Sequence, residues 1–220
     1  GRMVLFVTKA ANLIPGDDAG FSDVFLRDRY EGTTRRISIG IADTLLDNNA
    51  YNATISGDGT ITAFSSQATN VVANDTNGDI DVFTRENFGS NIDRVSVSSF
   101  EGQGTGTSDN ASISDDGRYV AFGSASLLAG GFPGGAFNVY IRDRTAGTTE
   151  LVNVKSDETL GDAGGGGAEL SGSGRYVAFS SDATNLVSGD TNGQRDVFVR
   201  DRTAGTTVRV RVRVTNNTGH

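Results

Sequence analysis

Three loops of this chain gather the oxygen-bearing side chains that a hard cation needs. They share the pattern Asp-x-Asn-Gly-x-x-Asp, which is complete at 75–81 and 190–196 and has alanine at the asparagine position at 17–23. Ca²⁺ takes roughly six to eight oxygen ligands, and alternate oxygens around a glycine turn can wrap one ion. The pattern therefore predicts Ca²⁺ as a cofactor. The candidate ligands are Asp17, Asp23, Asp75, Asn77, Asp79, Asp81, Asp190, Asn192 and Asp196.

A second interpretation of these loops needs no ion. Asp and Asn before Gly make Asx turns unaided, and Asp23, Asp81 or Asp196 could cap backbone amides. The spacing is shorter than that of an EF-hand loop and lacks its terminal glutamate. The corresponding loop of a third repeat, 132–138, has lost the oxygen-rich positions together. A shared ligand set would be lost as a group, although a concerted remodelling of one loop would look the same.

Other residue constellations offer little chemistry. The single histidine is the terminal His220, so a histidine general base or catalytic triad has no candidate. Arg-Asp-Arg recurs at 27–29, 142–144 and 200–202. It could bind an anion, but its repetition favours a strand end whose charges pair with neighbours. Paired acids such as those at 115–116 and 157–158 lie in turn-like stretches and are expected to be solvated. We therefore predict that the chain is not an enzyme.

The elements that must position these loops repeat along the chain. Glycines spaced 58, 58 and 57 residues apart each begin a stretch such as Gly-Arg-Tyr-Val-Ala-Phe. They are Gly1, Gly59, Gly117 and Gly174. A second anchor, Asp-Val-Phe or a close variant, keeps the same period and begins at Asp23, Asp81, Asn138 and Asp196. Two anchors in step over four copies indicate a genuine internal repeat.

Each repeat is predicted to form up to four strands. A short strand of small residues, as at 53–56, meets a glycine hairpin turn and then the second strand, as at 119–122. The third strand, as at 196–200, follows the acidic loop, and a further glycine turn leads to the fourth, as at 206–212. Consecutive apolar residues in the second and third strands indicate burial on both faces. Four phenylalanines are expected in equivalent buried positions: Phe6, Phe64, Phe122 and Phe179.

Sheets that are buried on both faces and repeat regularly are typical of a propeller. The predicted fold class is all-β: a β-propeller of four repeats whose blades have up to four antiparallel strands. A β-sandwich is the alternative, but it has no reason to repeat so regularly. The predicted blades are 1–51, which lacks its first strand, 52–109, 110–167 and 168–220. Because the chain opens inside a unit, we expect the fold to be incomplete or completed by another chain.

The run Ser-Gly-Ser-Gly-Arg-Tyr-Val-Ala-Phe-Ser-Ser at 171–181, followed by Asp-Val-Phe-Val-Arg-Asp-Arg at 196–202 and Thr206-Thr207, carries a resemblance. It resembles the WD40-like, TolB-type β-propeller repeat of bacterial proteins. The resemblance covers essentially the whole chain and is specific for the fold. It implies a binding platform, a periplasmic component or a domain attached to an enzyme, so the function must be argued from a site.

The composition of the chain limits the classes of partner that are expected. A net charge of −8 argues against nucleic acid, because phosphate binding needs a basic surface. No window approaches the ~18 apolar residues of a membrane helix, so membrane insertion is not expected. A protein partner or self-association is expected. The absence of tryptophan weakens sugar stacking, although five tyrosines and twelve phenylalanines leave a glycan ligand open. The absence of cysteine excludes disulfides.

Two functions fit these observations. The first is a non-catalytic binding or assembly module of an exported bacterial protein, extracellular or periplasmic, whose loops are stabilised by Ca²⁺. The second is a fragment or accessory domain of a larger secreted carbohydrate-processing enzyme, whose chemistry lies elsewhere.

Overall fold

The computed structural model describes residues 1–17 and 20–210, which form fifteen strands in four antiparallel sheets. We call these sheets blades 1 to 4. Blade 1 holds β1 (Met3–Thr8), β2 (Asp23–Asp28) and β3 (Thr33–Arg36). Blade 2 holds β4 (Ala50–Ile55), β5 (Ile61–Ser66), β6 (Asp81–Glu86) and β7 (Ile92–Arg94). Blade 3 holds β8 (Ser108–Ile113), β9 (Tyr119–Ser124), β10 (Asn138–Asp143) and β11 (Thr148–Leu151). Blade 4 holds β12 (Gly165–Leu170), β13 (Tyr176–Ser181), β14 (Asp196–Asp201) and β15 (Thr206–Arg209).

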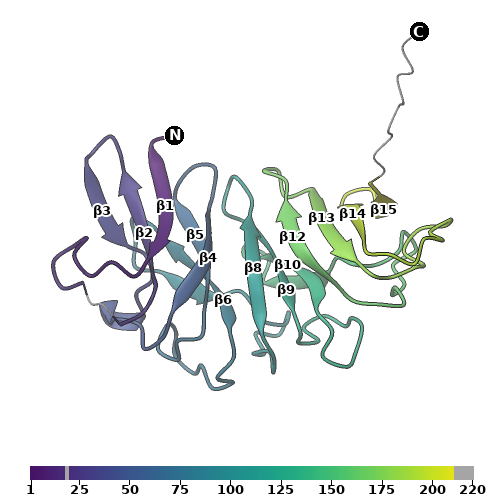
Figure 1. Ribbon diagram of the computed structural model, residues 1–220, viewed down its shortest axis with the longest axis horizontal. Helices are drawn as coiled ribbons and strands as arrows, with labels where there is room; N and C mark the ends of the chain where they lie inside the picture. Colours follow the sequence, from purple (N-terminus) through teal and green to yellow (C-terminus); the bar gives the residue numbers. More distant parts are fainter. Residues whose placement is uncertain (18–19, 211–220) are drawn as a thin grey trace, which may run out of the picture.

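The four blades stand side by side in an open arc (Figure 1), with β1, β4, β8 and β12 next to one another through its middle. Blades 1 and 4 lie at opposite ends of the molecule. The all-β propeller fold predicted from the repeats is confirmed, including the three-stranded first blade. The first strand of each complete blade begins two or three residues ahead of the boundaries predicted at 52, 110 and 168. Apart from the short 3-10 turn η1 (Ile41–Asp43) the described chain has no helix, so none is long enough to cross a membrane.

Each blade carries apolar side chains on both faces. Each inner blade is packed between two neighbours, so both of its faces are buried. Directly opposed residues of antiparallel strands share a face. In blade 2, Phe64 lies opposite Phe83, and this side of any blade is called its aromatic face. The other side carries Val82 and Ala63 and is called the valine face.

The same two faces meet at every contact between blades. The valine face of one blade packs against the aromatic face of the next in three separate clusters of buried residues. The clusters join Val24 and Leu26 to Phe64 and Phe83, Ala63 and Val82 to Phe122 and Tyr140, and Ala121 and Val139 to Phe179 and Phe198. The fold is therefore one apolar contact made three times, with the period of the repeat.

The four expected phenylalanines occupy equivalent positions, but they are not equally buried. Phe64 and Phe122 are fully buried and Phe179 nearly so, whereas Phe6 is only half-buried. In blade 1, Phe6 stacks on Phe25 with ring centroids 5.8 Å apart, and the counterparts in the other blades also lie ring against ring, stacked in blade 4 and tilted in blades 2 and 3. The prediction of burial was wrong for Phe6 because no described blade lies against the aromatic face of blade 1.

This difference has a measurable consequence. Phe122→Ala should cost about 3–5 kcal/mol of the free energy of unfolding, because it removes a ring from a closed contact between blades. Phe6→Ala should cost less than half as much, because one side of its ring already faces solvent. Urea unfolding followed by circular dichroism measures both, and equal losses would contradict the open first face.

Candidate functional site

Each acidic loop is reached by one arginine from the last strand of its blade. Arg36 of β3, Arg94 of β7 and Arg209 of β15 occupy the same register position, opposite the aromatic residue of the strand before it. Opposed residues share a face, so these arginines lie on the aromatic face. The last aspartate of each acidic loop begins that preceding strand, on the same face. The register therefore brings arginine and carboxylates together at the end of the sheet.

In blade 4 the arginine is hydrogen-bonded to both carboxylates. Arg209 Nη1 lies 2.6 Å from Asp190 Oδ1 and 3.0 Å from Asp196 Oδ2. Blade 1 repeats this arrangement, with Arg36 paired to Asp17 and 3.6 Å from Asp23. We call each such group an Asp-Asp-Arg triad.

In blade 2 the same triad is looser. The guanidinium nitrogens of Arg94 lie 3.6 Å from Asp75 Oδ1 and 3.6 Å from Asp81 Oδ2, although all three side chains are buried. The Arg94 Nε, like the Arg209 Nε of the tighter triad, has no hydrogen-bond partner in the described chain. Gln103 Nε2 donates to Asp75 at 3.0 Å, and Ser96 Oγ donates to Asp81 at 2.5 Å. The two carboxylates therefore depend partly on neutral donors.

The protonation of these carboxyl groups follows from their surroundings. Burial raises the pKa of Asp75 and of Asp81, and Arg94 only partly opposes it. Burial also acts to raise the pKa of Asp196, but hydrogen bonds from Arg209 and Asn192 outweigh it, so this pKa lies below its usual range. The pKa of Asp196 is therefore shifted in the opposite direction to those of Asp75 and Asp81.

The asparagines of the motif close the turn. Asn77 Nδ2 donates to Asp81 at 3.0 Å, and Asn192 Nδ2 donates to Asp196 at 3.0 Å. Asn77 Oδ1 accepts from the amide of Asp79, as an Asx turn requires. The Asp79 carboxylate is apart from the triad and is 3.5 Å from Thr107 Oγ1.

The structure therefore brings the six aspartates of the triads together in pairs, and Asn77 and Asn192 donate to one member of their pair, so that of the nine predicted ligands only Asp79 lies apart. Within residues 1–17 and 20–210, no three acidic or histidine side chains form a group that could hold a metal. Calcium binding at these loops stays a prediction. In each triad the arginine lies between the two carboxylates. Its positive charge takes the place that was predicted for the metal cation.

Sequence reasoning missed these arginines, although a signal for them exists. Arg36, Arg94 and Arg209 recur at the period of the repeat, and the third unit has Leu151 at that position. The repeat that lost its aspartates is thus the repeat that lost its arginine.

Blade 3 replaces the charged triad with neutral hydrogen bonds. Asn138 Oδ1 accepts from the amide of Phe132 at 2.8 Å, and Asn138 Nδ2 donates to the Phe132 carbonyl at 3.0 Å. The Tyr140 hydroxyl, absent in the other blades, lies 2.9 Å from the Ser126 carbonyl and 2.6 Å from that of Gly130. In blade 3 the hydrogen bonds of the Asn138 amide and the Tyr140 hydroxyl replace the ion pairs of the other blades. This replacement explains why the acidic positions of the loop at 132–138 changed together.

The Arg-Asp-Arg motif is structural, as its repetition predicted. Its aspartate forms a two-pronged pair with the arginine that follows the repeat glycine, as Arg118 Nε and Nη2 donate to Asp143 at 3.0 and 2.6 Å. The same aspartate accepts from the two backbone amides that follow it by two and three residues. The pair with Arg118 holds the pKa of Asp143 down to about 2. Asp28 with Arg2, and Asp201 with Arg175, repeat the arrangement.

The two arginines of the motif have separate partners. The second donates to the carbonyl of the repeat glycine, as Arg144 does to Gly117 at 2.8 Å and Arg202 to Gly174 at 2.7 Å. In two of the motifs the first arginine reaches back to an acidic residue in the loop that leaves the preceding blade, as Arg142 does to Glu101 and Arg200 to Glu158. Blade 2 has Arg-Glu-Asn at this place, and its Arg85 makes the equivalent pair with Asp43.

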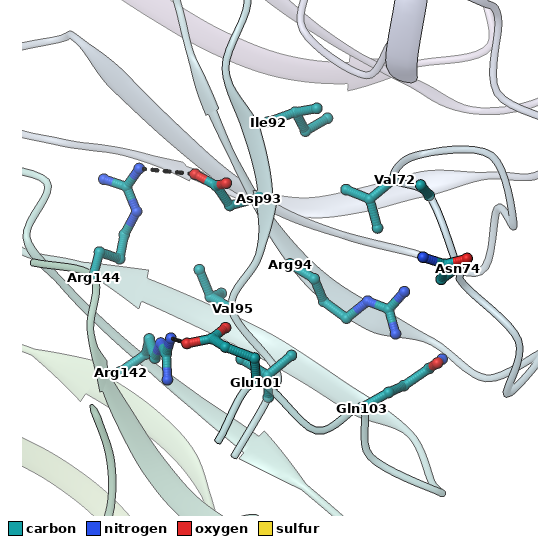
Figure 2. A pocket seen from close by; sticks show the side chains of 12 residues that line it. Val72, Asn74, Ile92, Asp93, Arg94, Val95, Glu101, Gln103, Arg142 and Arg144 are labelled. Carbon is teal, nitrogen blue, oxygen red and sulfur yellow. Dashed lines mark hydrogen bonds and ion pairs between the residues drawn. The ribbon is translucent and has the colours of Figure 1, made fainter. Parts of the chain in front are cut away.

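A hollow of about 490 Å³ lies between blades 2 and 3, beside the looser triad (Figure 2). Arg94 lines one side, and Arg142 and Arg144 line the other, where they face Glu101 and Asp93. A hollow of about 650 Å³ between blades 3 and 4 repeats this plan with Arg200 and Arg202. Both hollows therefore lie at the contacts between blades, and the charges that line them are largely paired.

Comparison with known proteins supports the fold. Neither a family model nor a curated protein matches the sequence. A protein assigned as TolB from Agrobacterium tumefaciens is 16% identical, with a TM-score of 0.57 over 95% of this chain and 61% of that one. The β-propeller domain of the Trilobed protease from Pyrococcus furiosus, described as having an open velcro topology, is 13% identical, with a TM-score of 0.52 over 95% of this chain and 54% of that one.

An enzyme is also among the similar structures. Oligogalacturonate lyase from Vibrio parahaemolyticus is 13% identical, with a TM-score of 0.53 over 94% of this chain and 48% of that one. At these identities the likeness shows the fold alone, which is a TolB-type β-propeller. The chain spans about three fifths of the TolB protein and about half of the other two.

The role of the blade 2 triad can be tested by replacing its charged side chains with neutral ones, as blade 3 has them. Arg94→Leu should cost about 3–5 kcal/mol of the free energy of unfolding, because it leaves two buried carboxylates without their cation. Adding Asp75→Asn and Asp81→Asn should recover part of that loss, since the buried charges are then removed. Urea unfolding of the single and triple variants measures the difference. A triple variant less stable than Arg94→Leu would contradict the coupling.

The Arg118–Asp143 pair sets the response to acid. A carboxyl group whose pKa is lowered on folding stabilises the native state above its unfolded pKa of 3.8, and that stability is lost as the pH falls towards about 2. Asp28, with its pKa also lowered to about 2, acts in the same window. Asp75 and Asp81 act oppositely, because a raised pKa adds stability as the pH falls towards 3.8. Arg118→Gln should therefore flatten the loss of stability between about pH 4 and 2, measured by thermal unfolding. An unchanged slope would argue against the pair.

Proposed function

We propose that this chain is a non-catalytic binding and assembly module of an exported bacterial protein. The observation that carries the proposal is the fold itself, an arc of repeated blades that aligns over 95% of its length with the TolB protein from Agrobacterium tumefaciens. Stacked repeats of this kind present extended surfaces that repeat proteins use for binding.

The charged residues support the same conclusion. The triads, the Arg-Asp-Arg motifs and the arginines lining the hollows are engaged in pairs that recur from blade to blade. A catalytic centre needs a unique constellation with a perturbed group aimed at a substrate. Repeated pairs of this type instead support strand ends and connections between blades.

A second candidate is an accessory domain of a larger secreted carbohydrate-processing enzyme. The likeness to oligogalacturonate lyase, of which this chain spans 48%, favours it. Incubation of the purified chain with oligogalacturonate separates the two, with ultraviolet detection of unsaturated products. The proposed function predicts no turnover, and turnover by the chain alone would replace it with an enzymatic function.

Calcium binding by the acidic loops is part of the proposal and can be tested on blade 2. A ligand at a hundred times its dissociation constant adds ~2.7 kcal/mol per site to native stability. We expect calcium to raise the melting temperature of Arg94→Leu more than that of the wild type, because removing the arginine leaves two carboxylates for an ion. The triple variant with Asp75→Asn and Asp81→Asn is the matched control and should not respond. Equal melting temperatures in calcium and chelator for all three proteins would leave Asx turns and ion pairs as the whole role of the loop.

A further inference from the structure

The hollow between blades 2 and 3 and the hollow between blades 3 and 4 share one wall. In each, the two arginines of an Arg-Asp-Arg motif pair with acidic residues. These pairs are Arg142–Glu101 and Arg144–Asp93 in the first hollow, and Arg200–Glu158 and Arg202–Glu150 in the second. The repeat therefore supplies a matched comparison. The residues that differ between the two hollows are the ones that could bind a specific ligand.

Two positions on the opposite wall differ. Arg94 occupies the register position at which blade 3 has Leu151. Gln103 forms the same isolated bridge to the preceding strand end as Leu160 does one repeat later. The hollow between blades 2 and 3 therefore has a guanidinium and an amide where the other hollow has two leucines.

Arg94 is buried, but it makes no hydrogen bond within the described chain. Its side chain is 7% exposed, and its nitrogens lie 3.6 Å from the oxygens of Asp75 and Asp81, beyond hydrogen-bond distance. In blade 4, Arg209 donates to the equivalent carboxylates at 2.6 and 3.0 Å. Neutral donors satisfy the two carboxylates of blade 2 instead. The donors of Arg94 are therefore available to an acceptor from outside the chain.

The surroundings of Arg94 favour an acidic ligand. Figure 2 shows the guanidinium extending towards Asn74 and Gln103 within the hollow. Three arginines and two acidic residues line this hollow, an excess of one positive charge on a chain whose net charge is −8. Asp75 and Asp81, which are 3% and 0% exposed, lie outside the lining. Their charges oppose an anion, so a ligand must be held by hydrogen bonds as well as by charge.

We propose that this hollow binds a small organic acid, whose carboxylate is held by Arg94 with the amides of Asn74 and Gln103. The planar guanidinium can donate two parallel hydrogen bonds to a carboxylate, which a point charge cannot do. The apolar body of the acid lies against Val72 and Ile92, which line the same hollow. A volume of about 490 Å³ is within the range of small-molecule pockets. This inference gives the proposed binding module a class of ligand and rests on that function.

Nuclear magnetic resonance of the full chain tests the site directly. Titration with benzoate and with hexanoate should shift the Nε–H signal of Arg94 to saturation. Benzamide and hexanamide, the neutral counterparts, should bind at least about tenfold more weakly, because they lack the charged acceptor. The Nε–H signal of Arg202, which lines the hollow between blades 3 and 4, should not move and is the internal control.

Matched variants separate the site from the stability of the blade. Arg94→Lys keeps the charge but loses the fork of donors, and it should weaken benzoate binding by at least about tenfold. Because a change at Arg94 also affects the triad, Gln103→Leu provides a second test. It copies the residue of the other hollow and should weaken binding as well. Leu160→Gln makes the reverse change in the other hollow and should leave the affinity unchanged. Circular dichroism checks that each variant is folded.

Two results would overturn the proposal. One is an Arg94 signal that neither acid moves at the limit of its solubility. The other is equal binding of the acids and their amides, which would show that the carboxylate is not recognised. Turnover of oligogalacturonate by the chain would contradict the non-catalytic function and leave these titrations unchanged, so the two failures are distinguishable.

Discussion

The structure depends on the packing of one blade against the next. A blade is a small sheet with apolar side chains on both faces, so no blade can keep its two faces out of water alone. The same valine and aromatic faces meet at all three contacts, which ties the burial of each sheet to the presence of its neighbours. This dependence explains the strict period of the repeat, because every blade must present the same two faces to its neighbours.

Charged residues serve this packing by fastening the ends of the strands. Burying an ion pair recovers little net free energy, and neutral substitutes can do as well, so such pairs fix geometry more than they add stability. Blade 3 shows the exchange within one chain, because Leu151 and Asn138 stand where blade 4 has Arg209 and Asp196. The same sheet forms either way, which means that the triad is one of several local solutions to holding a loop.

Much of the fold could be predicted from the sequence, because the four repeats can be aligned with one another. The glycine and Asp-Val-Phe anchors predicted the strand order, the three-stranded first blade and the structural role of Arg-Asp-Arg. The triads were not foreseen, because Arg94 lies on a separate strand from Asp75 and meets it only through the register of β6 and β7. The half-burial of Phe6 was missed for a related reason: local pattern reports which side of a strand is apolar, but burial depends on what covers it.

An arc of identical contacts also constrains where function can lie. A residue that recurs in three of the four blades, as Asp28, Asp143 and Asp201 do, meets a need that those blades share, and that need is structural. A specific function must use what differs between blades. Blade 3 shows such a difference, because Asn138, Tyr140 and Leu151 stand where the other blades have aspartate, phenylalanine and arginine. A specific function is therefore expected at a break in the repeat of this kind rather than at its most conspicuous motif.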